Sequence, residues 1–233
     1  MISRVSMIEH SRLAGTGRLA DDLYLIAHHE ISGRPYLSSR SAGIGLAGGL
    51  LAELMATQAP AVTLDRGYLI PRYRKNGARV ARYARPDDLV SAHVLDLIVA
   101  ESASRPVRDW LLFLGKTAAA DVAGRLEHAG YLTRPAGRIP RRARPLVPVE
   151  GDWSRCALLR AHSALDGTRA LTLYSALLTG LTVACGLGFR FANLSIAPTR
   201  GTGEAVGALP RPLRELTAQV QVAADAVVLS ARM

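Results

Sequence analysis

Arginines in two stretches of the sequence are the residues best suited to bind an anion. Residues 66–85 contain seven positive side chains and no acidic one, with Tyr73 and Tyr83 between them. Residues 131–150 contain five arginines and no acid before Glu150. A guanidinium group can bind two phosphate oxygens at once, so both stretches suit phosphate groups. The simpler alternatives are a solvated basic face and codon usage that favours arginine over lysine.

Motifs for catalysis or metal binding are missing from the sequence. The only adjacent histidines, His28 and His29, would point roughly 100° apart on a helix, which does not suit a shared metal ion. The sequence has no serine elbow, Walker loop or paired-cysteine motif. Cys156 and Cys185 lie in apolar surroundings, where we expect inert core thiols in a reducing cytoplasm. We therefore expect a protein that is not an enzyme and has no cofactor.

The composition indicates a globular protein with an anionic partner. The chain has 233 residues, 49% of them hydrophobic, and a formal net charge of +10. That length can bury a substantial core. Its charge favours nucleic acid, an acidic membrane surface or an acidic protein as the partner. The N-terminus lacks the apolar run of a signal peptide, so secretion is not expected.

Hydrophobic periodicity predicts a mainly helical chain. A helix is expected over 18–29, and a second helix, capped by Ser39 or Ser41, is expected to follow. Its glycines Gly45, Gly48 and Gly49 lower helix propensity, so they predict close helix packing instead. A hairpin with its turn at Gly67 comes next.

The remaining helices are marked by local signals. Asp87-Asp88 and Pro106 each precede a helix, a third runs over 117–128 to Gly130, a fourth lies near 155–165, and the last begins at Pro212. Four prolines exclude a helix from 131–150 and leave an edge-like hairpin. The uncharged segment 171–189 is just long enough to span a bilayer, but its glycines and threonines favour a buried central helix.

These elements predict a mainly α fold. We expect a flexible arm over 1–17, followed by one domain over 18–233. In this domain amphipathic helices ring a buried central helix, and short β-hairpins are attached to it.

Segment 18–71 carries the most distinctive motifs of the sequence. They read RLADDLYLIAHHEISGRPYL, then GLAGGLLAELMATQAPAVTLDRGYLI; further along come RPDDLVSAHVLDLI, DWLLFLG and GRLEHAGYLT. In this order the motifs resemble the Golgi phosphoprotein 3 family, in its bacterial, especially actinobacterial, branch. The resemblance covers about residues 18–135 and weakens beyond Pro148.

The resemblance implies a helical peripheral membrane protein that binds phosphatidylinositol 4-phosphate. In eukaryotic members of that family, a tryptophan and three arginines hold the headgroup. The LLAEL motif places the tryptophan position at Leu37 or Ser38 and the first arginine position at Ala47. The GRLEHAGYLT motif places the other two at Lys116 and Ala119. Only Lys116 is charged, which favours general attachment to anionic lipids over a specific phosphoinositide pocket.

We therefore expect a cytoplasmic, membrane-associated protein that binds anionic phospholipid headgroups and acts as an adaptor. An acidic protein partner and a homo-oligomer formed through the 131–148 hairpin are expected on the same grounds. The residues expected to bind headgroups are Lys116, Arg72, Arg74, Arg134, Arg138, Arg141, Arg142 and Arg144.

The alternative function is that of a nucleic-acid-binding regulator. The expected helix–hairpin–basic-loop units are those that a winged helix contains, and residues 66–85 would contact the phosphates of the nucleic acid. No expected recognition helix carries the Arg, Asn or Gln side chains that read bases. Nucleic acid is therefore the less favoured partner.

Overall fold

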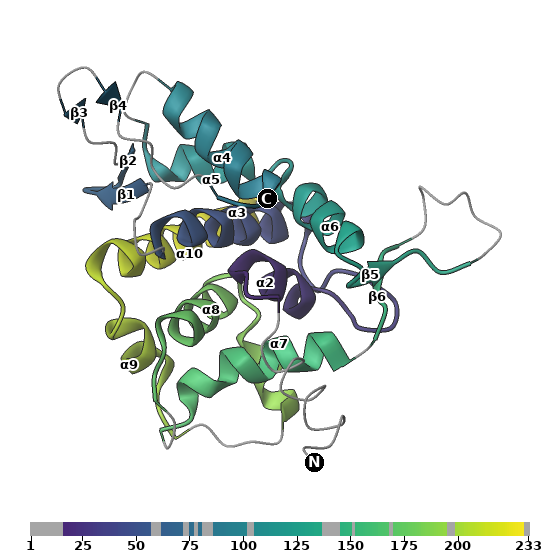
Figure 1. Cartoon of the computed structure of the whole chain (residues 1–233). Coiled ribbons are helices and arrows are strands. Elements are labelled where there is room, and N and C mark those ends of the chain that lie inside the picture. Colours follow the sequence, from purple (N-terminus) through teal and green to yellow (C-terminus); the bar gives the residue numbers. More distant parts are fainter. Residues whose placement is uncertain are drawn as a thin grey trace, which may run out of the picture.

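A buried helix, α3 (Ser39–Ala56), lies at the centre of the protein (Figure 1). The computed structural model describes residues 16–56, 62–71, 75–76, 79–80, 86–101, 105–136, 145–150, 152–167, 170–194 and 199–230. Within these residues α3 packs against six further helices. They are α2 (Leu19–Ala27), α4 (Leu89–Ala100), α5 (Val107–Leu114), α6 (Ala118–His128), α8 (Leu173–Ala184) and α10 (Arg211–Ser230).

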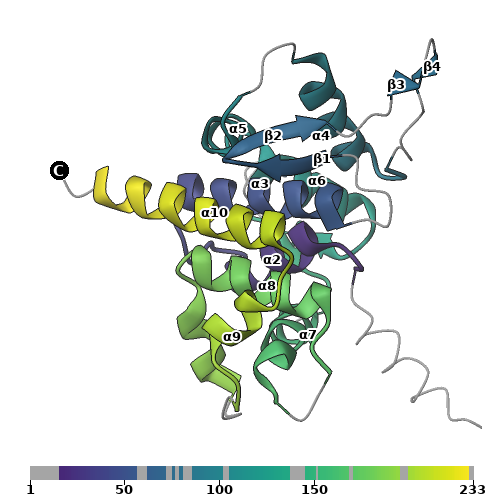
Figure 2. The same ribbon diagram turned by 90° about the vertical axis from the view of Figure 1, so that its left-hand side faces the viewer.

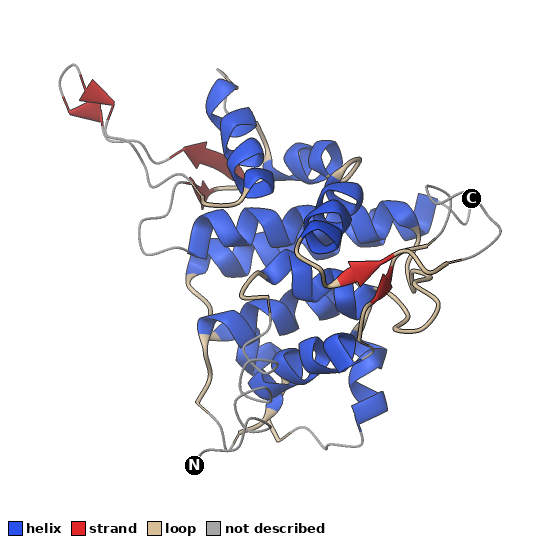
Figure 3. Ribbon diagram, turned by 45° about the vertical axis from the view of Figure 1, so that its right-hand side comes forward, coloured by secondary structure: helices blue, strands red, loops and turns tan. Residues whose placement is uncertain are grey.

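The other helical elements lie outside this ring of six. Helix α7 (Asp152–His162) packs against α2 and α8. The 3₁₀ segment η2 (Ser163–Leu165) continues it, and η3 (Gly188–Leu194) follows α8. Helix α9 (Thr202–Gly207) packs on α8. Helices dominate the described residues, as Figure 3 shows, so the predicted mainly α domain is confirmed.

Strands form three short antiparallel pairs among the described residues. β1 (Val62–Asp65) pairs with β2 (Tyr68–Pro71), β3 (Lys75–Asn76) with β4 (Arg79–Val80), and β5 (Leu132–Thr133) with β6 (Val147–Pro148). The turn between β1 and β2 has Arg66 at φ 50° and Gly67 at φ 81°. The sequence predicted this hairpin and the edge-like β5–β6 pair.

Glycines allow α3 to approach its neighbours closely, as predicted. A Cβ on Gly49 would lie 3.0 Å from the Cα of Ala20, and one on Gly48 would overlap Val220 of α10. A Cβ on Gly43 would overlap the carbonyl oxygen of Gly115, after α5. Since most positions of α3 are buried, its apolar residues surround the helix rather than form one stripe.

Two details of the sequence prediction are wrong. The cap of α3 is Ser38, whose Oγ accepts a hydrogen bond from the N–H of Ser41 at 3.1 Å. Segment 171–189 is not one helix, because α8 ends at Ala184 and Gly186 follows with φ 82°. Helix α8 is buried as expected, but the element that touches most of the others is α3.

Helices α3 and α10 lie side by side and run in opposite directions (Figure 2). The beginning of α3 and the end of α10 therefore lie at the same end of the molecule. The turn between α2 and α3 reaches the β5–β6 pair, since Gly33 packs against the backbone of Leu146. This end of the molecule carries the candidate site.

Candidate functional site

Two of the eight residues predicted to bind headgroups lie in the described part of the chain. They are Lys116, in the turn between α5 and α6, and Arg134, just after β5. Arg134 is half-buried, and its Nε donates a hydrogen bond to Oε1 of Glu127 at 3.2 Å. The other six predicted residues lie outside the described residues: Arg72, Arg74, Arg138, Arg141, Arg142 and Arg144.

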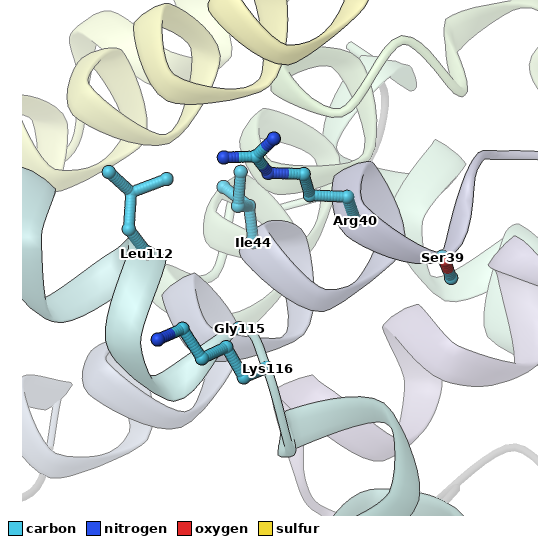
Figure 4. A pocket seen from close by; sticks show the side chains of 6 residues that line it. All are labelled: Ser39, Arg40, Ile44, Leu112, Gly115 and Lys116. Atoms are coloured by element: carbon cyan, nitrogen blue, oxygen red, sulfur yellow. The ribbon is translucent and has the colours of Figure 1, made fainter.

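Lys116 lines an open pocket of about 410 Å³ at the beginning of α3. The pocket is formed by Ser39, Arg40, Ile44, Leu112, Gly115 and Lys116, and we refer to these six residues as the cationic pocket. Figure 4 shows the side chains of Arg40 and Lys116 on either side of Ile44, with Leu112 at one wall. The structure thus joins one predicted residue to a cation, Arg40, that the sequence analysis missed.

Close backbone contact places the two cations together. Because Gly43 and Gly115 lack side chains, the first turn of α3 touches the end of α5. The backbone N–H of Lys116 donates to the carbonyl of Phe113 at 3.3 Å, which fixes the turn that carries the lysine. The distance between Arg40 and Lys116 is therefore set by backbone packing rather than by flexible loops.

The charges of the cationic pocket are not neutralised by the described part of the protein. Both cationic side chains are exposed, and no ion pair joins either of them to a described carboxylate. Arg40 also stands in the first turn of α3, where the helix dipole disfavours a cation. That unfavourable position is the one signal in the sequence by which Arg40 could have been found. Two unpaired cations beside an apolar wall suit a phosphate attached to an apolar group.

A second charged cluster lies around α2, and its arginines are paired with carboxylates. Its residues, which we call the buried ion-pair network, are Arg18, Asp21, Asp22, Glu53, Asp88, Arg125, Arg160 and Tyr174.

Arg125 of α6 connects three carboxylates of this network. Its Nε donates to Asp21 at 2.8 Å, and its Nη1 donates to Asp88 at 2.8 Å and lies 3.6 Å from Glu53. Burial raises the pKa of Glu53 to about 7 and that of Asp21 to about 6, although Arg125 opposes both shifts. Burial also acts on Asp88, but hydrogen bonds from Ser91 and Arg125 outweigh it and lower its pKa.

Asp22 and Arg160 form the other half of the network. The carboxylate of Asp22 is fully buried and accepts two hydrogen bonds of 2.6 Å from Arg160. The hydroxyl of Tyr174 donates a third at 2.7 Å, and burial raises the pKa of that tyrosine. These partners of Asp21 and Asp22 lie more than one hundred residues away in the chain and were not predicted from the sequence.

Comparison with family models decides the relationship of this chain. The model described as Golgi phosphoprotein 3 (GPP34) matches residues 19–228. The chain belongs to the Golgi phosphoprotein 3 family. A comparison with curated proteins found no significant match.

Of the positions that the family resemblance assigned to the headgroup, Lys116 is the one that lines the cationic pocket. Ala47 is fully buried inside α3, and Ser38 is occupied in capping that helix. Arg40 precedes Ala47 by seven residues, so it lies two turns earlier on the same face of α3. In this member of the Golgi phosphoprotein 3 family, the cation of α3 therefore stands closer to the start of the helix than Ala47.

The cysteines and potential metal ligands in the described part of this family member do not form a metal site. Both cysteines are free thiols, and burial raises the pKa of Cys185 to about 12. Among the described residues, no group of three or more His, Cys, Asp or Glu side chains is placed to hold a metal ion. Within the same residues, no helix has both the length and the apolarity needed to cross a membrane.

Proposed function

We propose that this protein binds the headgroups of anionic phospholipids and attaches to membranes peripherally. The cationic pocket carries the proposal, because Arg40 and Lys116 face one open cavity without described carboxylate partners. The volume of about 410 Å³ is enough for a phosphorylated headgroup, since small-molecule pockets begin near roughly 300 Å³. Membership of the Golgi phosphoprotein 3 family supports the same function.

The pocket favours general recognition of phosphate over one fixed headgroup. An arginine and a lysine supply the charge, and only the guanidinium can bind two phosphate oxygens in parallel. Arginines of the 66–85 and 131–150 stretches would add attraction to the leaflet, at about 1 kcal/mol per basic residue near the surface. We propose phosphatidylglycerol, cardiolipin and phosphatidylinositol 4-phosphate as ligands of the same site.

The finer parts of the proposal follow from the sequence. We propose that the protein belongs to the bacterial branch of the family, which the motifs in 18–71 resemble, and that it is a cytoplasmic, non-enzymatic protein at the inner face of a membrane. We also propose that the 131–148 hairpin mediates homo-oligomer contacts and that the basic surface accepts an acidic partner protein.

Co-sedimentation of the wild-type protein with vesicles tests the function. We expect binding to rise with the fraction of anionic lipid in phosphatidylcholine vesicles and to fall as salt is added, because salt screens exposed charges. A DNA mobility shift at matched salt tests the nucleic-acid alternative. Equal binding to neutral and anionic vesicles, or binding to DNA alone, would contradict the proposal.

A further inference from the structure

Two strongly exposed apolar side chains of the described residues lie in segments that contact each other, the turn before α3 and η3. Ile31 is 79% exposed at the tip of the turn between α2 and α3, and Phe189 is 53% exposed in η3. The Tyr36 ring meets the Phe189 ring edge-on, with 6.0 Å between ring centroids. We call Ile31, Tyr36 and Phe189 the apolar patch.

An ion pair and a stacked guanidinium join the two segments of the patch. Glu30, which precedes Ile31, lies 3.7 Å from the guanidinium of Arg190, which follows Phe189. The same guanidinium stacks over the Tyr36 ring, 4.3 Å from its centroid, and donates a hydrogen bond to the tyrosine hydroxyl. Ile31 and Phe189 are therefore the sequence neighbours of two residues that form one ion pair, although they are far apart in the sequence.

Four backbone N–H groups of the turn, those of residues 29 and 31–33, are satisfied by internal hydrogen bonds. The N–H of Ile31 and that of Ser32 both donate to Nδ1 of His29, at 3.2 Å and 3.3 Å. Gly33 N–H donates to the His29 carbonyl, and His29 N–H donates to the Arg34 carbonyl, each at 2.8 Å. Such a turn can enter a region with little water without leaving these donors unpaired.

The apolar patch and the cationic pocket lie close enough to touch the same surface. Tyr36 is followed after one residue by Ser38, the cap of α3, and then by Ser39 and Arg40 of the pocket. Four residues of chain span at most about 14 Å. Arg34, Arg40 and Lys116 are all exposed around this region, so the apolar side chains stand among cations.

We propose that Ile31 and Phe189 insert into the lipid interface when the cationic pocket binds an anionic headgroup. The proposal rests on the proposed function and names the residues that enter the bilayer. Protruding apolar side chains surrounded by arginine and lysine suit an anionic membrane, where the cations meet phosphates and the apolar groups leave water. A partner protein would instead require an apolar groove facing this protruding turn.

Vesicle binding of matched double variants tests the insertion of Ile31 and Phe189, which we call the anchor. Ile31→Ser/Phe189→Ser removes the inserting groups, whereas Leu89→Ser/Leu173→Ser removes two exposed leucines near the opposite end of α2. Their neighbours Asp88 and Tyr174 contact Arg18, at the start of α2, whereas Ile31 follows its end. We expect the first pair to weaken binding to phosphatidylglycerol vesicles by roughly tenfold or more, and the control pair to bind as the wild type does.

Fluorescence of Ile31→Trp provides a readout that does not depend on affinity. We expect its emission, corrected for the wild type, to shift to the blue on vesicles and to be quenched by brominated lipid. If the first double variant unfolds, the fluorescence of Ile31→Trp alone decides whether this position enters the membrane.

Each remaining outcome separates the anchor from the proposed function. Wild-type binding with no loss in Ile31→Ser/Phe189→Ser, an equal loss in both double variants, or no blue shift would overturn the anchor and leave headgroup binding intact. A wild-type protein that binds no anionic vesicle would overturn both.

Discussion

Arginine has opposite roles in two regions of this protein. In the buried ion-pair network, Arg125 and Arg160 are matched by carboxylates at hydrogen-bond distance. In the cationic pocket, Arg40 and Lys116 are exposed and face an open cavity without described carboxylate partners. The comparison teaches that net charge alone does not nominate a candidate site, whereas cations without a carboxylate partner among the described residues do.

The largest effect is expected from breaking the buried network at Asp22. Asp22→Ala removes the fully buried carboxylate that accepts two hydrogen bonds from Arg160, which should cost roughly 3–5 kcal/mol of unfolding free energy. Thermal unfolding should report a melting temperature about 10 °C lower. Glu204→Ala is the matched control, because it breaks an ion pair with Arg200 in which the carboxylate is 70% exposed, and it should change stability by less than about 1 kcal/mol. Similar losses in both variants would contradict the difference between buried and exposed pairs.

A smaller loss is expected where α3 touches the end of α5. In Gly43→Ala, the new methyl group would overlap the Gly115 carbonyl, so we expect a loss of roughly 1–3 kcal/mol and weaker vesicle binding, since both cations move apart. Gly124→Ala in α6 is the control, because a Cβ there meets open space and helix propensity favours alanine. A Gly43→Ala protein as stable as Gly124→Ala would show that the contact is loose.

The buried ion-pair network should also make the stability of the protein depend on pH. Glu53 and Asp21 have raised pKa values in the folded protein, about 7 and about 6, so folding favours their protonated forms. Their contribution is present below the unfolded values near pH 4 and is lost as the pH rises towards 7. In Glu53→Gln the unfolding free energy, measured by urea titration, should fall less steeply between about pH 4 and pH 7. Glu204→Gln, at an exposed position, should keep the wild-type slope, and an unchanged slope in Glu53→Gln would contradict the assignment.

Local signals in the sequence were enough to predict most helices and the first hairpin. Asp88 caps α4 through the N–H groups of Val90 and Ser91, and Gly130 ends α6 with φ 79°. Each of these features depends on a few neighbouring residues. The glycines of α3 predicted close packing for the same reason, since only a nearby helix explains so many in one helix.

Partners distant in sequence were not predictable in this way. Arg125 and Arg160 lie 104 and 138 residues from Asp21 and Asp22, and nothing in a single sequence pairs them. The cationic pocket was missed for the same reason, because Arg40 and Lys116 line one pocket only when the chain folds and Gly43 packs against Gly115. The arginine count drew attention to the 66–85 and 131–150 stretches, most of whose expected site residues lie outside the described residues.

Charge reversal at the cationic pocket tests the central claim most directly. Arg40→Glu/Lys116→Glu and the control Arg211→Glu/Arg214→Glu change the net charge equally. The control lies at the start of α10, the end of the molecule opposite the start of α3. The measurement is the affinity for phosphatidylglycerol vesicles at fixed salt, with the melting temperature as the check on folding. We predict that the pocket variant loses binding at least tenfold more than the control at an unchanged melting temperature. Equal losses in the two variants would contradict the claim, because binding would then depend on net charge and not on this site.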